Sequence, residues 1–309
     1  MGRRWNGAMT HRVRALKETS RAYLYLVPAV VIIGAFIIFP MAHAFYLSLH
    51  DWPPIETARR PRQFIGVENY TRLLASPRFV GSLRNVALYA LFSVPLSIAL
   101  AVGLAVLLNT KLRGQAVFRL AFFLPFATPA VADALIWRWL LDERVGLINY
   151  LLGWIGVSPI GWLTTPALAI PVLVVLNVWQ TVGFQAIILL AGLQGINAAY
   201  YEAAKIDGAN AWCRLRRITV PLLTPQIFFL SIISALAALE MFTQVFVLWV
   251  GSPGPVASAL TPVFFIYETA FERHRMGLAA AASYILFSVM MILTLIQFAV
   301  AKRRVHYDQ

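Results

Sequence analysis

Charged side chains are unusually few in this sequence of 309 residues. Charged side chains make up 13% of the chain and hydrophobic ones 60%, whereas an average soluble domain carries about 25% charged residues. Acidic groups are the rarest, with 13 Asp and Glu against 26 Lys and Arg, and the formal net charge is +13. A chain so poor in charge is predicted to be an integral membrane protein.

Other shortages exclude whole classes of site. The single cysteine, Cys213, excludes an internal disulfide framework and has no neighbour for a metal site. The five histidines show no HExxH spacing, so no metal site is predicted. None of the four lysines follows a glycine, so a GxxxxGKS or GxxxxGKT phosphate-binding loop cannot be built and ATP hydrolysis by that route is excluded. Most arginines flank apolar segments, which favours membrane topology over nucleic-acid binding as the reason for the positive charge.

Six apolar segments are long enough to cross a bilayer, which takes about 20 helical residues. They cover residues 22–49, 86–108, 120–141, 166–193, 222–250 and 277–301. Proline interrupts the third segment at Pro125 and Pro129, and a short helix is expected in the loop 251–275. We therefore predict an all-α integral membrane protein with six transmembrane helices. Its expected parts are a tail, first helix and external loop (1–80), a five-helix core (81–301) and a second tail (302–309).

The distribution of basic residues predicts the orientation. Of the 26 Lys and Arg residues, 16 fall on the side of both termini and 10 on the other side. The excess places both termini in the cytoplasm, because cytoplasmic loops are enriched in Lys and Arg. One loop goes against the trend, since the first external loop carries six arginines: Arg59, Arg60, Arg62, Arg72, Arg78 and Arg84.

The longest polar interruption in the second half of the chain runs from Tyr201 to Pro225. It is predicted to form a short helix, a break at Gly208 and a second short helix capped by Asn210. Irregular polar backbone cannot face hydrocarbon. We therefore expect this segment at the membrane surface, where a soluble partner can reach it.

The same segment resembles the EAA loop of binding-protein-dependent ABC import permeases. The resemblance rests on Glu202-Ala203-Ala204, Gly208, Ile218 and Pro221 at the family's spacing. The inner Asp207-Gly208-Ala209 is similar to the carbohydrate (maltose and glycerol-3-phosphate type) subgroup, although Val220 replaces the usual leucine. Weaker similarities follow in the family's order: FIGVENY at 64–70, the segment 119–149 and the closing stretch 266–283.

The resemblance implies an ABC type I importer permease in the cytoplasmic (inner) membrane of a bacterium or archaeon. It implies that the loop at 200–221 couples to an ATPase dimer, and that this dimer binds ATP and Mg while the chain itself carries no cofactor. The other implied partners are a second homologous permease, an extracytoplasmic solute-binding protein and a sugar or glycerol-phosphate-type solute. The residues implied in coupling are Glu202, Ala203, Ala204, Asp207, Gly208, Ile218 and Pro221.

Polar side chains inside the spans are the candidates for the solute path. Ionisable groups cost about 2.5–3.5 kcal/mol in a span on insertion scales and by default face the bundle interior. Glu240 and Gln244, four residues apart, are expected on one helical face. A second set shares a face of the fourth span, and the resemblance implies that both faces line a sugar site. The full set of path candidates is Asn177, Thr181, Phe184, Glu240, Gln244 and Asp133.

Plainer interpretations remain open for several of these residues. Glu240 is also compatible with a buried structural carboxylate, Asp133 with an ion pair to Arg138, and Phe184 with ordinary packing. The sequence departs from the family after Phe242, where Thr243 replaces the usual aspartate. The functional alternative is a stand-alone channel or a membrane scaffold without a transport cycle.

Overall fold

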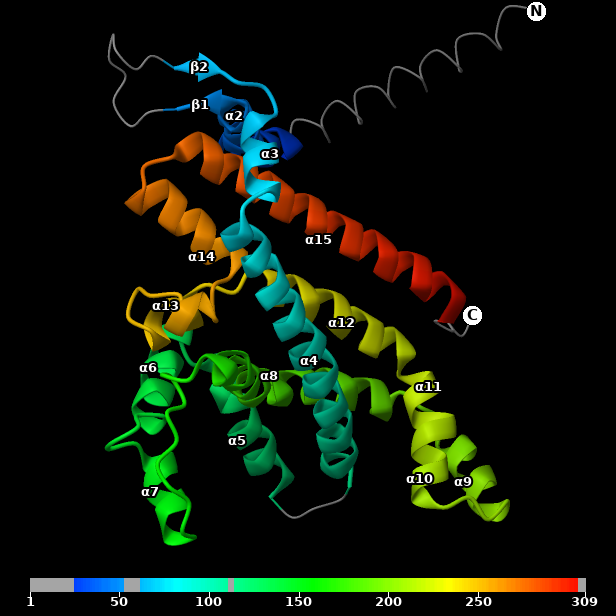
Figure 1. The fold of residues 1–309 in the computed structure, drawn as a ribbon. Helices are drawn as coiled ribbons and strands as arrows, with labels where there is room; N and C mark the ends of the chain where they lie inside the picture. The colour runs from blue at the N-terminus through cyan, green and yellow to red at the C-terminus, as the bar shows by residue number, and fades with distance from the viewer. Residues whose placement is uncertain (1–24, 53–61, 111–113, 305–309) are drawn as a thin grey trace, which may run out of the picture.

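The computed structural model describes residues 25–52, 62–110 and 114–304, and Figure 1 shows their arrangement. Helices make up almost all of the regular structure. The exception is a small antiparallel pair, β1 (His50–Asp51) and β2 (Gln63–Phe64), which follows the first span. The expectation of an all-α chain is thus correct for the bundle but misses this two-stranded pair at its edge.

Within the described residues, four helices are long and apolar enough to cross a membrane, judged by length and composition. They are Tyr25–Ser48, which contains the π-helical turn η1 (Gly34–Ile38) and α2 (Phe39–Ser48); α4 (Pro77–Leu108); η2 (Pro166–Leu168) continued by α8 (Ala169–Gln194); and α15 (Met276–Arg304). These helices confirm the first, second, fourth and sixth predicted spans. The number rises to six if each of two bent helix pairs counts as one span.

The first bent pair replaces the third predicted span. It consists of α5 (Gln115–Ala127) and α6 (Ala130–Leu140), which meet at an angle of 97°. The bend lies where Pro129 follows Thr128, whose extended backbone ends α5 and whose hydroxyl donates to the Pro125 carbonyl over 2.6 Å. A residue before proline disfavours the helical conformation, so the break follows from the sequence.

The second bent pair corrects the fifth predicted span. A helical run formed by α10 (Ala211–Arg214), η3 (Leu215–Thr219) and α11 (Val220–Leu222) meets α12 (Thr224–Leu239) at 68°. We expected this span to continue to Val250. Instead α12 ends at Leu239, and a separate helix, α13 (Thr243–Leu248), follows after a break.

Shorter helices cap the bundle, and their positions agree with one membrane orientation. They are α3 (Glu68–Leu74), α7 (Leu147–Trp154), α9 (Ala198–Ile206), η4 (Pro255–Ala257), α14 (Pro262–Tyr267) and η5 (Glu268–Glu272). In Figure 1 the segments predicted to be external, β1, β2, α7 and α14, lie towards the left. The α9–α10 hairpin and the end of α15, both predicted to be cytoplasmic, lie towards the right.

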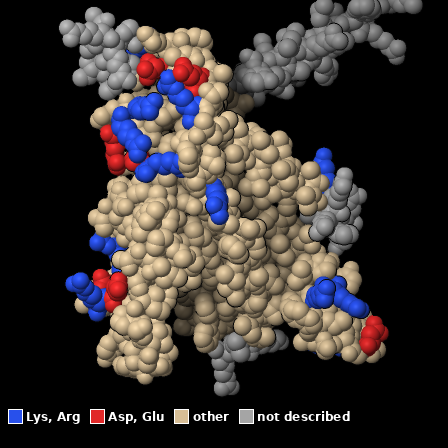
Figure 2. All heavy atoms as spheres, viewed as in Figure 1, with Lys and Arg blue, Asp and Glu red and all other residues tan. Residues whose placement is uncertain are grey.

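Helices α4 and α8 form the centre of the packing. A Cβ placed on Gly183 of α8 would come within 1.8 Å of the Phe122 carbonyl oxygen of α5, so glycine permits backbone-to-backbone contact there. On the face that Figure 2 shows, most of the surface is uncharged: charged side chains gather mainly at the upper left, the left edge and the lower right, and a broad, largely uncharged area lies between them. Such an area suits lipid and neighbouring membrane subunits.

Candidate coupling and solute-path sites

The coupling candidate begins with α9, which is capped at both ends by local signals. The Asn197 side chain accepts a hydrogen bond from the Ala199 amide over 2.9 Å and satisfies one of the free N–H groups at the helix start. Lys205 lies in the last turn, where a cation is favoured by the helix dipole. The signals that begin and end the helix 198–206 therefore all lie within residues 197–209.

Gly208 ends this helix in the left-handed conformation that the sequence predicts, with φ +76°. The Ala209 amide donates to the Ala204 carbonyl over 2.8 Å, and the Gly208 amide donates to the Lys205 carbonyl over 3.1 Å. This pair of bonds is a Schellman motif. A Cβ on Gly208 would meet no atom within 4 Å, so glycine is required here by the backbone conformation and not by lack of space.

The second helix of the hairpin is fixed to the first by polar contacts. Asn210 caps α10, as predicted, by accepting from the Cys213 amide over 2.8 Å. Arg214 donates to the Ala209 carbonyl over 3.1 Å, and the hydroxyls of Tyr201 and Thr219 lie 3.0 Å apart. The hairpin is therefore a unit closed by its own polar contacts.

The hairpin presents an exposed surface of mixed character. Ile206 is 87% and Trp212 is 69% exposed, and large apolar side chains so exposed in a polar loop indicate a protein contact. Among the predicted coupling residues, Glu202, Ala203, Asp207, Gly208 and Pro221 are exposed, whereas Ala204 and Ile218 are partly covered.

Two hollows flank the hairpin. One, of about 610 Å³, lies where the end of α8 faces α11 and α12, and its lining includes Gly192, Tyr200 and Gln226. The other, of about 410 Å³, lies between the end of α4 and α10, with Asn109 and Lys205 in its lining. The hairpin is thus bordered by open space on two sides and is not packed into the bundle.

Asp133, in the first turn of α6, is a buried carboxylate with neutral partners. It is 1% exposed, and its Oδ2 atom accepts from the Gln180 amide of α8 over 2.8 Å. Its Oδ1 atom accepts from the hydroxyl of Thr128. The ion pair with Arg138 that we considered is absent from the described residues. Asp133 therefore ties the bend between α5 and α6 to the middle of α8.

The three path candidates on α8 differ in how fully they are engaged. The hydroxyl of Thr181 donates to the Asn177 carbonyl of its own helix over 2.8 Å. The Phe184 ring stacks on Phe126 of α5 with centroids 4.1 Å apart and an interplanar angle of 7°. Phe184 is thus packed against a ring of this chain, as the plain interpretation expected, but stays partly exposed. Asn177 is also partly exposed, and no hydrogen bond to its side chain occurs within the described ranges.

Glu240 and Gln244 do not share a helical face, contrary to our expectation. Glu240 is the C-cap of α12, whereas Gln244 lies in the first turn of α13. Glu240 is also exposed, so it is not the buried structural carboxylate that we weighed as an alternative. A carboxylate at a helix C-terminus is disfavoured by the helix dipole. The helix dipole therefore does not account for a carboxylate at this position.

Sequence reasoning missed two polar residues that the structure connects to the same helices. Thr128 was noticed only through the prolines around it. Gln185, 2% exposed, donates to the hydroxyls of Ser97 in α4 and Ser234 in α12, both over 3.2 Å. The available signal was a glutamine in the middle of an uncharged span, since a buried amide group needs hydrogen-bond partners. Within the described residues, no group of three or more His, Cys, Asp or Glu side chains could hold a metal.

Comparison with known proteins places this geometry among transport components. Residues 93–306 match the family described as "Binding-protein-dependent transport system inner membrane component". The chain is 33% identical to the trehalose/maltose transport system permease protein MalF of Thermococcus litoralis, covering 93% of this chain and 96% of that protein. It is 34% identical to the lactose transport system permease protein LacF of Rhizobium radiobacter, covering 91% and 94% of the two chains.

A solved structure shows the same fold. A chain of the bacterial alginate ABC transporter, crystallised in complex with an alginate pentasaccharide-bound periplasmic protein, superposes with a TM-score of 0.83. The match covers 96% of this chain and 99% of that chain at 24% sequence identity. The likeness over almost the whole of both chains confirms the predicted permease fold of an ABC importer.

Proposed function

Because the chain belongs to the family of binding-protein-dependent transport system inner membrane components, we propose that it forms half of the translocation pathway of an ATP-driven importer for a sugar or glycerol-phosphate-type solute. The chain is an integral membrane permease subunit of an ABC importer and is itself non-catalytic. The observation that carries the finer proposal is the exposed, closed hairpin of α9 and α10 at the end of α8.

The hairpin is the proposed docking site for the ATPase. Docking needs a rigid exposed element joined to the spans, and the Schellman turn at Gly208 together with the cap at Asn210 provides it. The proposed contact residues are the predicted coupling set, Glu202, Ala203, Ala204, Asp207, Gly208, Ile218 and Pro221. ATP and Mg would be bound by the ATPase dimer, because the sequence offers no phosphate-binding loop of its own.

The remaining partners follow from the proposed transport cycle. A second homologous permease would complete the pathway, and its contact would cover part of the apolar surface that this chain exposes. A solute-binding protein would deliver solute on the external side, towards the left of Figure 1. The proposed location is the cytoplasmic membrane of a bacterium or archaeon, with both termini in the cytoplasm.

The proposed solute path runs along the polar side chains of α6, α8 and the break after α12. Asn177 is partly exposed and Glu240 is exposed, and the side chain of neither makes a hydrogen bond within the described part of the chain. Gln244 and Thr181 are partly exposed, as is Phe184, whose ring offers an aromatic wall. A carbohydrate is the proposed solute class because such groups recognise hydroxyls, and because similar permeases are named for trehalose, maltose and lactose transport.

Co-purification tests the assembly directly. A full-length chain with a C-terminal affinity tag, extracted in mild detergent, is expected to bring down an ATPase and a second permease. The test variant carries Trp212→Ala and Ile206→Ala, which remove two exposed apolar side chains of the hairpin. This variant should lose the ATPase and retain the second permease. Recovery of the tagged chain alone, with passive solute flux after reconstitution, would favour the channel alternative.

A further inference from the structure

A small cavity rich in arginine lies where α3 and α4 meet α14, η5 and α15. Its volume is about 180 Å³, and its lining includes Arg72, Arg78, Arg273, Arg275 and Thr269. The volume corresponds to about six water molecules at about 30 Å³ each. It is therefore large enough for a compact anion and too small for a disaccharide, since ligand pockets usually measure about 300–1,000 Å³.

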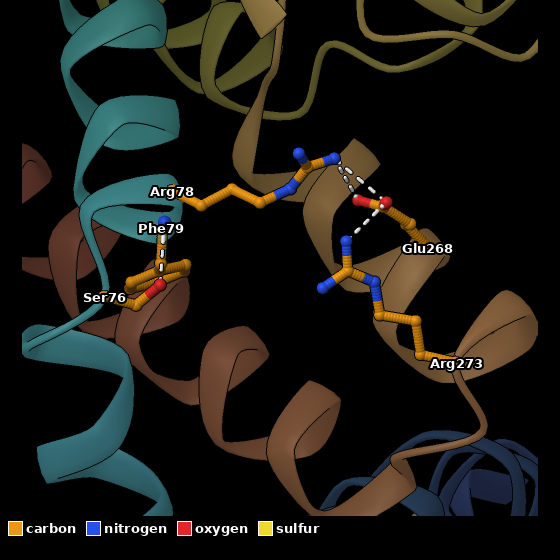
Figure 3. Close-up of polar contacts among 5 residues, drawn as sticks. All are labelled: Ser76, Arg78, Phe79, Glu268 and Arg273. Atoms are coloured by element: carbon orange, nitrogen blue, oxygen red, sulfur yellow. Dashed lines mark hydrogen bonds and ion pairs between the residues drawn. The ribbon is translucent and has the colours of Figure 1, made fainter.

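The charges around this cavity do not cancel. Glu268 bridges Arg78 and Arg273, with nitrogen–oxygen distances of 2.8 Å to each, and Figure 3 shows both guanidinium groups converging on its carboxylate. Arg72 pairs with Glu68 of its own helix over 2.6 Å. Arg275 is exposed and has no ion pair among the residues described. Among the described residues, the four arginines that line the cavity thus have two carboxylates as ion-pair partners.

Two buried polar atoms at this cavity also lack partners. Thr269 is 1% exposed, and its hydroxyl makes no hydrogen bond in the described structure. The Nε atom of Arg78 is likewise buried without a partner. Buried donors are nearly always satisfied, since leaving one unpaired costs about 1–3 kcal/mol. Both can donate, so the missing partner is an acceptor.

We propose that this cavity binds a single tetrahedral oxyanion, a phosphate or sulfate group, on the external side of the membrane. Guanidinium groups match oxyanions because they offer paired N–H donors in one plane. Arg275 and Arg78 would supply the charge-assisted bonds, and the Thr269 hydroxyl would supply a neutral one. Such a site also gives a reason for arginines on a loop where the membrane orientation predicts few.

The test is a titration of the full-length chain, purified in detergent with the subunits that accompany it. Inorganic phosphate or sulfate is added at constant ionic strength against chloride, and the midpoint of thermal unfolding is followed. Specific binding raises the midpoint in proportion to the logarithm of anion concentration above the dissociation constant. We expect Arg275→Gln and Thr269→Val to weaken the apparent affinity at least tenfold. Arg84→Gln, an exposed arginine of α4 outside the cavity, should leave it unchanged.

A second arm separates the two sources of the group. In nanodiscs of phosphatidylglycerol, a lipid-derived phosphate would fill the site, so added phosphate would no longer shift the wild-type midpoint. A dissolved anion as ligand would shift it in nanodiscs and in detergent alike. Chemical modification of arginine by phenylglyoxal on the wild-type protein gives an independent readout, because bound phosphate should slow the reaction at Arg275.

Three results would overturn the proposal. The first is an equal effect of chloride and phosphate, which means general screening. The second is an unchanged response in both Arg275→Gln and Thr269→Val, or, should both variants fail to fold, no protection from phenylglyoxal. The third is a loss of solute-binding-protein affinity in Arg275→Gln without any anion response, which assigns the cavity to a protein contact. The first two results leave the proposed transport function untouched, whereas the third would agree with its solute-binding-protein partner.

Discussion

Two helix breaks in this chain arise in different ways. The turn between α9 and α10 is held by neighbouring residues, through the backbone bonds around Gly208 and the cap at Asn210. The break between α12 and α13 contains neither glycine nor proline, and no side chain caps the start of α13. A break with no local cause must be imposed by the rest of the fold.

The contacts around the second break identify what imposes it. The Met241 carbonyl accepts from the hydroxyl of Thr261, 20 residues away, over 2.7 Å. The Phe242 ring packs within 5.1 Å of Tyr267 and 5.9 Å of Phe264, both on α14. The backbone around Met241 is therefore shaped by α14, whereas the first break shapes itself. We therefore expect the first break to be disturbed by backbone strain at a single residue, Gly208. We expect the second break to be disturbed by the loss of its contacts with α14.

Gly208→Val should have the largest effect. A β-branched residue resists a φ of +76°, at a cost of about 1–3 kcal/mol that the hairpin can relieve only by changing its turn. Solute uptake at equal expression is expected to fall more than tenfold while membrane insertion persists. Gly156→Val is the matched control, since Gly156 has φ +80° and equally open surroundings but lies outside the hairpin. Equal losses in the two variants would remove the coupling interpretation.

Gln244→Ala and Glu240→Gln come next, because they change the chemistry of the second break and not its shape. Loss of one hydrogen bond to solute costs about 1–3 kcal/mol, and 1.4 kcal/mol is a factor of ten. Uptake should therefore fall about tenfold, with basal ATPase activity and assembly retained. Ser288→Ala, an exposed residue of α15 bonded within its own helix, is the control. Normal transport by both variants would place the path elsewhere, and failed assembly of Glu240→Gln would make the carboxylate structural.

Thr261→Val should have a smaller effect that is mainly thermodynamic. The substitution keeps the side-chain volume, leaves the Met241 carbonyl without its donor and removes the cap on the Phe264 amide. The free energy of unfolding should fall by about 1–3 kcal/mol, measured as a lower midpoint of thermal unfolding. Thr294→Val, which removes only a bond to Met290 one turn earlier, should change the midpoint less. Identical midpoints for the two variants would mean that the break does not depend on α14.

The smallest effect concerns the anchoring of α14 through η5. Burial raises the pKa of Glu268, but hydrogen bonds and charges from Arg78 and Arg273 outweigh it and hold the pKa below its usual value of 4.5. A lowered carboxylate pKa contributes stability that is complete at neutral pH and is lost as the pH falls below 4.5 and through the folded-state value.

Thermal unfolding at pH 7 and at pH 3.5 measures this contribution. The wild-type midpoint should drop more on acidification than that of Glu268→Gln, which has no carboxylate to protonate. Glu68→Gln is the control, because it alters an ion pair whose two side chains are each about half exposed. Its unfolding midpoint should fall on acidification as much as that of the wild type. A full acid-dependent drop in Glu268→Gln would show that this bridge does not anchor α14.

What the sequence could predict follows the same division between local and distant causes. The spans, the turn at Gly208 and the cap at Asn210 were predictable because each depends on residues within one or two helical turns. The end of α12 at Leu239 was not, because its cause lies on α14. Of the two partners of Asp133, only Thr128 lies close enough in sequence to be predicted, at 5 residues, whereas Gln180 is 47 residues away. That Glu240 and Gln244 lie on different helices was not predicted, because the break between α12 and α13 was not predicted.

The bridge between Arg78 and Glu268 has a consequence for how the chain is made. The two residues are 190 positions apart. At about 5–20 residues per second, the ribosome reaches Glu268 about 10–40 s after Arg78. In the predicted orientation, Arg78 therefore reaches the external side before its counter-charge has been made, whereas Arg72 already has Glu68 beside it. The membrane orientation of the first two spans therefore has to be set by the basic tail that precedes them. The Glu268 carboxylate, made later, then stabilises that orientation by pairing with Arg78.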